Sequence, residues 1–420
     1  MQPTGPSSPS RLQNPQPNPH RTATMNYERF YSRSAAELSP VAIREVADRI
    51  GGRDVVSFGA GWPNEATFPA DEVADLVEQT LADRAGEALQ YGTTQGDPEL
   101  RRLVAERLRE RHGADVTAEN VLITAGSQQG LYLAARAFLD PGEEVAVGAP
   151  TYVAALTAFD RVASPEYVTV PVDEDGLQVD VLEQRLESSD PAFVYTVPTF
   201  QNPSGATTTA ARRGRLAELA REHEFVVVED QPYDALRYEG EPVEPLVSLA
   251  PEHTVHLGTS SKVFAPGFRL GWAVAPEPVI RRLELLKQPV DLMTGVFAQH
   301  VVREYLATGR IEDQLADTRS LYREKRDLML DALVEHMPAG VEWNRPEGGM
   351  FLWLTFPEDV DGTELLEDAL DEGVAFIPGE PFYAGEPERN TARLNFTSVD
   401  DEELTKGVRR LARAVRAHGE

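Results

Sequence analysis

The 420-residue sequence has no cysteine and few basic side chains. The absence of cysteine excludes disulfide bonds, thiolate nucleophiles, iron–sulfur clusters and cysteine-bound zinc, and it suits a reducing cytoplasm. The 40 Lys and Arg residues stand against 69 Asp and Glu, which gives a formal net charge of -29. Nucleic acids and anionic membrane surfaces would repel such a chain. No apolar run approaches the roughly 18 residues that a membrane span needs. We therefore expect a cytoplasmic protein that binds neither nucleic acid nor membrane.

Lysine is especially scarce, because it occurs only at positions 262, 287, 325 and 406. An acidic surface with little lysine suits strong salt, where the Debye length falls to about 3 Å at 1 M and screens self-repulsion. A GC-rich genome would also favour arginine over lysine, but it would not explain the excess of acidic residues. The composition therefore predicts a halophilic protein.

Hydrophobic periodicity divides the chain into four parts. Residues 1–24 are rich in proline and polar residues, and we expect a disordered extension there because they cannot bury enough apolar surface. Residues 25–70 are expected to join a smaller C-terminal α+β domain over 311–420, which has a long polar helix, short strands and a closing helix from Asp401. Between 71 and 310, apolar runs (121–124, 144–147, 193–197, 225–228, 254–257, 270–274) alternate with helical patterns (71–85, 97–111, 128–139, 209–223, 277–287).

This alternation predicts an α/β fold with a mostly parallel sheet covered by helices on both faces. The first two helical patterns are each expected to open with an acidic cap, Asp71 and Asp97. Ligands should gather at the carboxyl ends of the strands.

Several common motifs are missing. The sequence has no glycine-rich nucleotide loop after a strand and no G-x-S-x-G turn of a serine hydrolase. The closest histidine pair, His253 and His256, falls in a predicted strand without a third ligand, so we expect ordinary packing and no metal.

Polar residues instead follow the predicted strands. Ser127 opens a helix, and helix N-termini bind phosphates, although a plain N-cap explains Ser127 equally well. Glu229 and Asp230 end an apolar strand, where a carboxylate can pair with a buried cation or cap a turn. The segment that starts at Asn202, 202–205, is typical of a turn.

Lys262 is the strongest single signal. It follows an apolar strand among the hydroxyls of Thr259 and Ser261, seven residues before Arg269. Lysine forms Schiff bases with carbonyls once desolvation or nearby cations lower its pKa. A phosphate site, a buried carboxylate and a Schiff-base lysine are together what pyridoxal phosphate requires.

From Met25 to the C-terminus the sequence resembles class I pyridoxal-phosphate aminotransferases of fold type I. Within that family it is similar to the branch of 2-aminoadipate, kynurenine and multi-substrate aromatic aminotransferases. The resemblance implies a large domain with a mostly parallel seven-stranded sheet and a smaller α+β domain. The motifs that carry it are at residues 61–64, 88–91, 126–130, 195–198, 202–205, 229–233, 261–262, 267–271, 348–351 and 393–396.

The resemblance also implies a role for each site residue. Lys262 would form the Schiff base and act as general base, and Asp230 would hold the pyridine nitrogen protonated. Arg393 would bind the substrate carboxylate near Gly61 and Asn202. Tyr91 would reach the site of a second subunit, which implies a homodimer with shared sites. Arg44 would meet a distal substrate carboxylate or lie exposed. The remaining cofactor contacts would be Asn202 and Tyr233 at the phenolic oxygen, Tyr152 on the ring face, and Ser127, Gln128, Thr259, Ser261 and Arg269 at the phosphate.

The implied reaction is transamination. The amino group of an aromatic, 2-aminoadipate or branched-chain amino acid would pass to a 2-oxo acid such as 2-oxoglutarate, with ping-pong kinetics. A β-lyase or decarboxylase on the same fold is an alternative. A regulator with a DNA-binding domain is a third, which the short N-terminal extension and the acidic charge disfavour. Trp62 stands where relatives often have leucine, which leaves the side-chain preference for substrate open.

Overall fold

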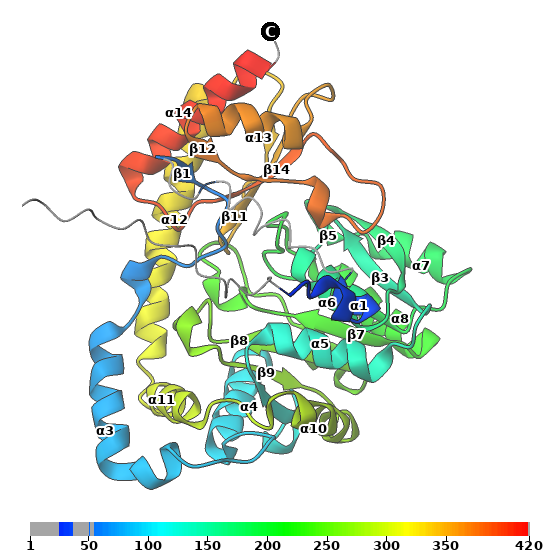
Figure 1. Ribbon diagram of the computed structural model, residues 1–420, viewed down its shortest axis with the longest axis vertical. Coiled ribbons are helices and arrows are strands. Elements are labelled where there is room, and N and C mark those ends of the chain that lie inside the picture. The colour runs from blue at the N-terminus through cyan, green and yellow to red at the C-terminus, as the bar shows by residue number, and fades with distance from the viewer. Residues whose placement is uncertain (1–24, 37–49, 51–53, 419–420) are drawn as a thin grey trace, which may run out of the picture. The chain divides into compact units, whose positions relative to one another are not determined.

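The computed structural model describes residues 25–36, 50 and 54–418 (Figure 1). The chain divides into two compact units, Met1–Ser39 and Pro40–Glu420. In the first unit the described residues form a 3-10 turn, η1 (Glu28–Phe30), and a one-turn helix, α1 (Arg33–Ala36). The disordered extension predicted for residues 1–24 lies outside the described residues.

The second unit is built on a sheet of eight strands in the order β2-β9-β8-β7-β6-β3-β4-β5. The central strands pair in parallel, whereas β9 and β5 are antiparallel to their neighbours. The expectation of a mostly parallel sheet is confirmed, and the two-residue β5 adds an edge strand to the seven expected. The strands are β2 (Val121–Thr124), β3 (Glu144–Ala149), β4 (Glu166–Asp173), β5 (Gly176–Leu177), β6 (Phe193–Thr196), β7 (Val226–Asp230), β8 (Thr254–Thr259) and β9 (Gly271–Val274).

Helices cover both faces of this sheet, as Figure 1 shows. Along β7, Val227 packs in a hydrophobic cluster with helices α7, α8 and α9, whereas Val228 packs in the main core that contains α5 and α6. Successive strand side chains point to opposite faces, so two buried faces explain the continuous apolar runs of the sequence. The same alternation separates the two carboxylates that end β7, Glu229 and Asp230.

The helices begin and end near the predicted residues, with one correction at a cap. Asp97 caps α4, since its Oδ1 accepts from the backbone N–H of Leu100 at 2.8 Å. Asp71 does not cap α3: Pro69 holds that position without a side-chain bond, because the helix begins one residue before Asp71. The helices are α3 (Ala70–Ala88), α4 (Pro98–His112), α5 (Ser127–Phe138), α6 (Val153–Val162), α7 (Val179–Leu186), α8 (Ala210–His223), α9 (Leu246–Leu249), α10 (Glu277–Asp291), α11 (Val296–Ala307), α12 (Ile311–His336), α13 (Gly362–Asp371) and α14 (Asp401–His418).

A smaller antiparallel sheet in the order β10-β11-β14-β13 lies in the C-terminal part of the chain with α12, α13 and α14. The segment after residue 54 joins this part, because β1 pairs in parallel with β12. The domain boundaries at residues 70 and 310 stay predictions. Among the described helices none is long and apolar enough to cross a membrane. These strands are β1 (Val56–Ser57), β10 (Glu342–Trp343), β11 (Phe351–Thr355), β12 (Val374–Ala375), β13 (Ile377–Pro378) and β14 (Thr391–Asn395).

Candidate active site

A cavity of about 220 Å³ lies where β6, β7 and β8 end. Every residue that the sequence assigned to the cofactor lines it, together with Val197 and Pro232. Val197 and Pro232 lie within the motifs of the resemblance, but the sequence assigned them no role because apolar side chains do not indicate a particular chemistry. The assigned residues at the cavity are Ser127, Gln128, Tyr152, Asn202, Asp230, Tyr233, Thr259, Ser261, Lys262 and Arg269.

One end of the cavity gathers hydrogen-bond donors at the start of α5. Ser127 is the first residue of that helix, and Gly126 takes the N-cap position with a φ of 85°. A Cβ on Gly126 would lie 2.8 Å from Nη2 of Arg269, so only glycine lets this guanidinium approach the helix. Arg269 Nη1 also donates to Oγ of Ser261 at 3.2 Å, and the hydroxyl of Thr259 donates to the same oxygen at 3.0 Å. A helix N-terminus, hydroxyls and a guanidinium fit a phosphate.

Asp230 supplies an anion at the end of β7. Its side chain is buried, Oδ2 accepts from the hydroxyl of Tyr195 at 3.2 Å, and Oδ1 has no partner among the described residues. Burial raises the pKa of Asp230 to about 7. A buried carboxylate with one free oxygen fits the protonated ring nitrogen of pyridoxal phosphate, because that N–H would satisfy the oxygen.

The side chain of Glu229 points to the opposite face of the sheet, away from the cavity. Its carboxylate accepts from the backbone N–H groups of Leu246 at 2.7 Å and Val247 at 3.2 Å, where α9 begins. Nδ1 of His256 lies 2.9 Å from Oε2, the oxygen that also accepts from Val247. The capping interpretation that the sequence left open therefore holds for Glu229 and not for Asp230.

Lys262 reaches into the cavity from the loop after β8. Its Nζ donates to the backbone oxygen of Gly61 at 2.8 Å. Burial, with the positive charges of Arg393 and Arg269, lowers the pKa of Lys262 to about 8. With this pKa about a tenth of the amine is neutral at pH 7, far more than for an ordinary lysine, and the neutral amine is the form that acts as nucleophile or general base.

Arg393 approaches from β14 of the smaller sheet and is 1% exposed. Its Nη1 donates to Oδ1 of Asn202 at 2.8 Å, and its Nη2 to the backbone oxygen of Gly59 at 2.6 Å. The guanidinium lies 4.4 Å from the ring centre of Phe351 and 5.3 Å from that of Phe382. Its hydrogen-bond partners are an amide and a backbone oxygen, no carboxylate of the described residues pairs with it, and burial lowers its pKa to about 10. The site lacks one anion, which a substrate carboxylate would supply.

Two residues that the sequence singled out, Tyr91 and Trp62, lie apart from the cavity. Tyr91 is 79% exposed on the loop after α3, and Trp62 is 72% exposed beside a separate open groove that also contains Phe68 and Pro266. Arg44 lies outside the described residues. Neither Tyr91 nor Trp62 is among the residues that line the cavity.

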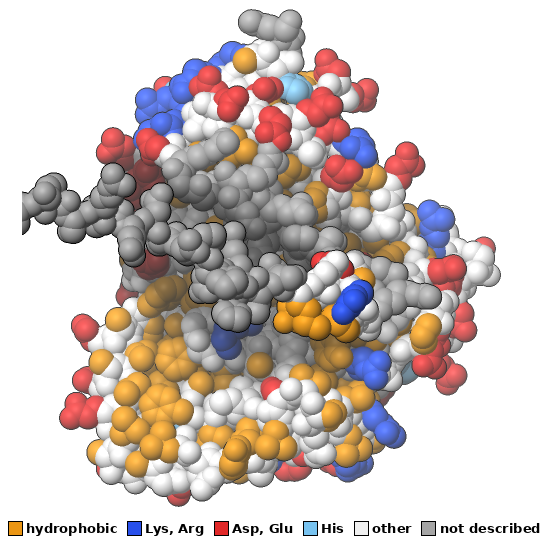
Figure 2. Space-filling view, in the orientation of Figure 1, with side chains coloured by type: hydrophobic (Ala, Val, Ile, Leu, Met, Phe, Trp, Pro, Cys, Tyr) orange, Lys and Arg blue, Asp and Glu red, His pale blue; other side chains and the backbone are white. Residues whose placement is uncertain are grey.

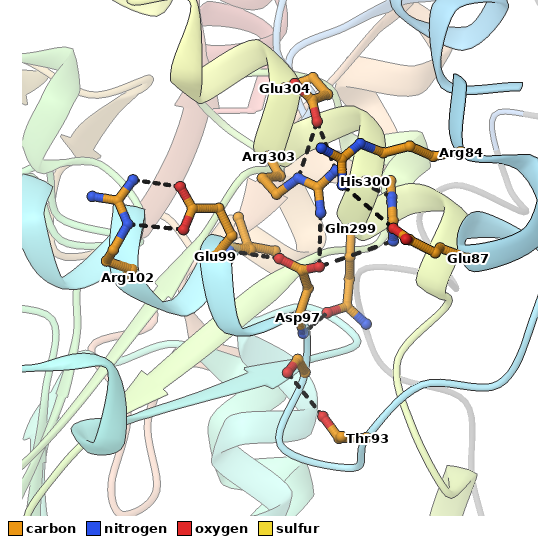
Figure 3. A network of polar contacts seen from close by, with 12 residues as sticks. Arg84, Glu87, Thr93, Asp97, Glu99, Arg102, Gln299, His300, Arg303 and Glu304 are labelled. Carbon is orange, nitrogen blue, oxygen red and sulfur yellow. Dashed lines mark hydrogen bonds and ion pairs between the residues drawn. The ribbon is translucent and has the colours of Figure 1, made fainter. Parts of the chain in front are cut away.

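A polar network fixes the loop that carries Tyr91 (Figure 3). Where the loop enters α4, Oδ2 of Asp97 accepts from Nη1 of Arg303 at 2.9 Å, and the backbone N–H of Asp97 donates to Gln299 at 2.7 Å. Within the loop, the hydroxyl of Thr93 donates to the backbone oxygen of Gly96 at 2.9 Å. Both Arg303 and Gln299 lie on α11, so that helix sets the position of the loop.

A buried lysine with a lowered pKa, a buried carboxylate and a cluster of donors suited to a phosphate lie at the strand ends of this sheet. Together they define a pyridoxal-phosphate-dependent enzyme of fold type I. Residues 53–411 match the family model described as aminotransferase class I and II. The chain belongs to this family and is a pyridoxal-phosphate-dependent aminotransferase.

Individual relatives agree. The aromatic-amino-acid aminotransferase 1 of Thermococcus litoralis is 44% identical over 399 residues, which cover 94% of this chain and 95% of that protein. The 2-aminoadipate transaminase of Thermus thermophilus is 38% identical over 93% of this chain and 98% of its own. The crystal structure of Pyrococcus horikoshii kynurenine aminotransferase, in complex with PMP, has a TM-score of 0.91 and 43% identity, and the match covers 94% and 99% of the two chains.

Proposed function

We propose that this aminotransferase takes its amino group from an aromatic, 2-aminoadipate or branched-chain amino acid and passes it to a 2-oxo acid, with 2-oxoglutarate as the expected acceptor. The observation that carries the proposal is the convergence of Lys262, Asp230 and Arg393 on one site. The relatives named for aromatic amino acids, 2-aminoadipate and kynurenine support this group of donors.

The chain's own residues have distinct tasks in this proposal. Bound pyridoxal phosphate supplies an electron sink that makes the α-proton of the amino acid acidic. Lys262 takes that proton at Nζ as a general base, since its pKa is lowered to about 8. Arg393 binds the α-carboxylate, with Asn202 and Gly61 nearby, so that the bond to be broken is correctly oriented. Asp230 keeps the ring nitrogen protonated.

The remaining cavity residues hold the cofactor. Tyr152 would stack on the ring, and Tyr233 would join Asn202 at the phenolic oxygen. Burial raises the pKa of Tyr152 to about 12 and that of Tyr233 further, so both hydroxyls stay protonated and can donate. Ser127, Gln128, Thr259, Ser261 and Arg269 would bind the phosphate.

A second copy of the chain would complete the site. Figure 2 shows hydrophobic side chains gathered over the face that carries α3 and α10. Large apolar side chains near these helices are exposed, including Leu89 at 69%, Leu285 at 56% and Leu292 at 52%. Tyr91 is exposed at 79% in the same part of the chain. We infer a homodimer that covers this face and brings Tyr91 to the partner's site.

A complementation experiment tests this arrangement. Lys262→Ala should abolish activity, and Tyr91→Ala should lower it. When the two variants exchange subunits, each mixed dimer should regain one site with a native Lys262 and a native Tyr91. Activity should then exceed the average of the two variants. No gain, with mixed dimers demonstrated by mass spectrometry, would contradict the shared site.

A substrate panel tests the reaction itself. Amino acids of the three proposed kinds should each yield glutamate when 2-oxoglutarate is present and should react little without an acceptor. Release of pyruvate without an acceptor would indicate the lyase alternative. Run in parallel at low and molar salt, the panel also tests the predicted halophilic character, which full activity at low salt and loss at molar salt would contradict. The cytoplasmic location and the role of Arg44 stay predictions.

A further inference from the structure

Tyr195 is a buried hydroxyl that the proposed reaction does not use. It lies on β6 opposite Val228 of the neighbouring parallel strand β7, so its side chain shares a sheet face with Asp230, two residues further on. The side chain is 0% exposed, and its ring meets that of Phe159 edge-on with the centres 5.4 Å apart. The hydroxyl is therefore held in one position by the core.

The two carboxylate oxygens of Asp230 have different surroundings. Tyr195 donates to Oδ2 at 3.2 Å, and this is the only hydrogen bond that the Asp230 side chain makes within the described ranges. Oδ1 is buried without a partner there, on a residue that lines the cofactor cavity. One oxygen is thus anchored, and the other is left for the ring nitrogen.

We propose that Tyr195 is a positioning residue for the cofactor: its hydroxyl anchors Oδ2 of Asp230, leaves Oδ1 for the ring nitrogen and favours the ionised form of the carboxylate. This inference rests on the proposed role of Asp230.

The electrostatics of the pocket support a donor at this place. A hydrogen bond to the charged form of a carboxyl favours that form and so opposes the effect of burial. The titratable groups that act on Asp230 are Tyr152 and Tyr233, which line the cavity, Tyr195 on β6 and His256 on β8. Burial holds the pKa of Tyr195 well above its usual value, so its hydroxyl remains a donor throughout the working pH range.

The test measures cofactor affinity in Tyr195→Phe. The full-length protein is converted to its pyridoxamine phosphate form, in which no covalent bond retains the cofactor, and the dissociation constant is measured between pH 6 and 9. The Tyr195–Asp230 hydrogen bond is also present without the cofactor, so only its strengthening on binding counts, and its loss should raise that constant about three- to tenfold. The pH midpoint of binding should move upward, because Asp230 loses the donor that favours its ionised form. The kcat of the amino acid half-reaction should fall, while the KM changes by less than about twofold, because Arg393 is untouched.

Tyr305→Phe is the matched control. Tyr305 is also a buried tyrosine, and its hydroxyl donates to Gln314 at 2.7 Å, away from the cofactor cavity. Both variants should lose some thermal stability, but Tyr305→Phe should leave the dissociation constant and its pH midpoint unchanged. A cofactor analogue with C–H in place of the ring nitrogen should abolish the difference between Tyr195→Phe and the unmodified protein.

If Tyr195→Phe fails to fold, replacement of Tyr195 by 3-fluorotyrosine keeps the shape and strengthens the donor, so the cofactor should bind more tightly and the pH midpoint should move downward. Unchanged affinity and midpoint in the variants that fold would overturn the proposal. Failure of the unmodified protein to bind pyridoxamine phosphate would instead count against the proposed cofactor role of Asp230.

Discussion

Replacement of Arg393 by lysine tests the carboxylate site most directly. The guanidinium is buried, donates to Asn202 and Gly59, and lies against the rings of Phe351 and Phe382. A lysine keeps the charge but not the planar fork that binds a carboxylate through two parallel hydrogen bonds. The variant therefore tests whether the site needs the planar geometry of the guanidinium and not only its positive charge.

The expected magnitude follows from the contact that is lost. One of two charge-assisted hydrogen bonds to the substrate carboxylate disappears, at about 1.5–3 kcal/mol, or roughly ten- to a hundredfold in kcat/KM. Amino acid and 2-oxo acid should be affected alike, because both present a carboxylate to the same group. Cofactor affinity should change little, since Arg393 is not among the residues that line the cofactor cavity.

The assay compares an amino acid with the amine that lacks its carboxylate. In Arg393→Lys the ratio of the two kcat/KM values should fall by the same ten- to hundredfold, roughly, whereas general damage would lower both equally. Arg326→Lys is the control, because Arg326 is also buried over an aromatic ring, that of Tyr238, but pairs with Glu239. It should lose stability and keep the ratio. An unchanged ratio in Arg393→Lys would refute the assignment.

Three further predictions concern the cavity. Lys262→Ala should lose the absorbance band of the lysine-bound cofactor and all transamination, and a persistent band would show that another lysine holds it. The rate at which the cofactor-free protein reacts with pyridoxal phosphate should rise with pH through about 8 as Lys262 loses its proton, whereas a midpoint near 10 would contradict the lowered pKa. Gly126→Ala should destabilise the fold by about 1–3 kcal/mol in urea unfolding, because its φ of 85° and the nearby Arg269 exclude a Cβ. Gly214→Ala on α8, where a Cβ meets nothing within 4 Å, should be neutral or stabilising.

The sequence alone predicted the mostly parallel sheet and the cofactor, and it named ten residues that the structure brings together at one cavity. Continuous apolar runs that alternate with helical patterns indicate a sheet buried on both faces. Because the chain has only four lysines, few residues other than Lys262 could form the Schiff base. Local patterns were less reliable where several residues compete for one task. Aspartate is a common N-cap residue, but α3 begins at Ala70, so Asp71 lies within the first turn of the helix and not at its cap.

The resemblance named Asp230 for the cofactor, but only the tertiary structure shows why Asp230 and not its neighbour Glu229 lines the cavity. Glu229 and Asp230 are equivalent in sequence, but the alternation of β7 turns Glu229 toward α9 and Asp230 into the cavity. The hydroxyl of Tyr195, the free oxygen of Asp230 and the ring-stacked guanidinium of Arg393 likewise depend on strands far apart in the chain. Such contacts follow from strand register and packing, which residue type and spacing do not specify.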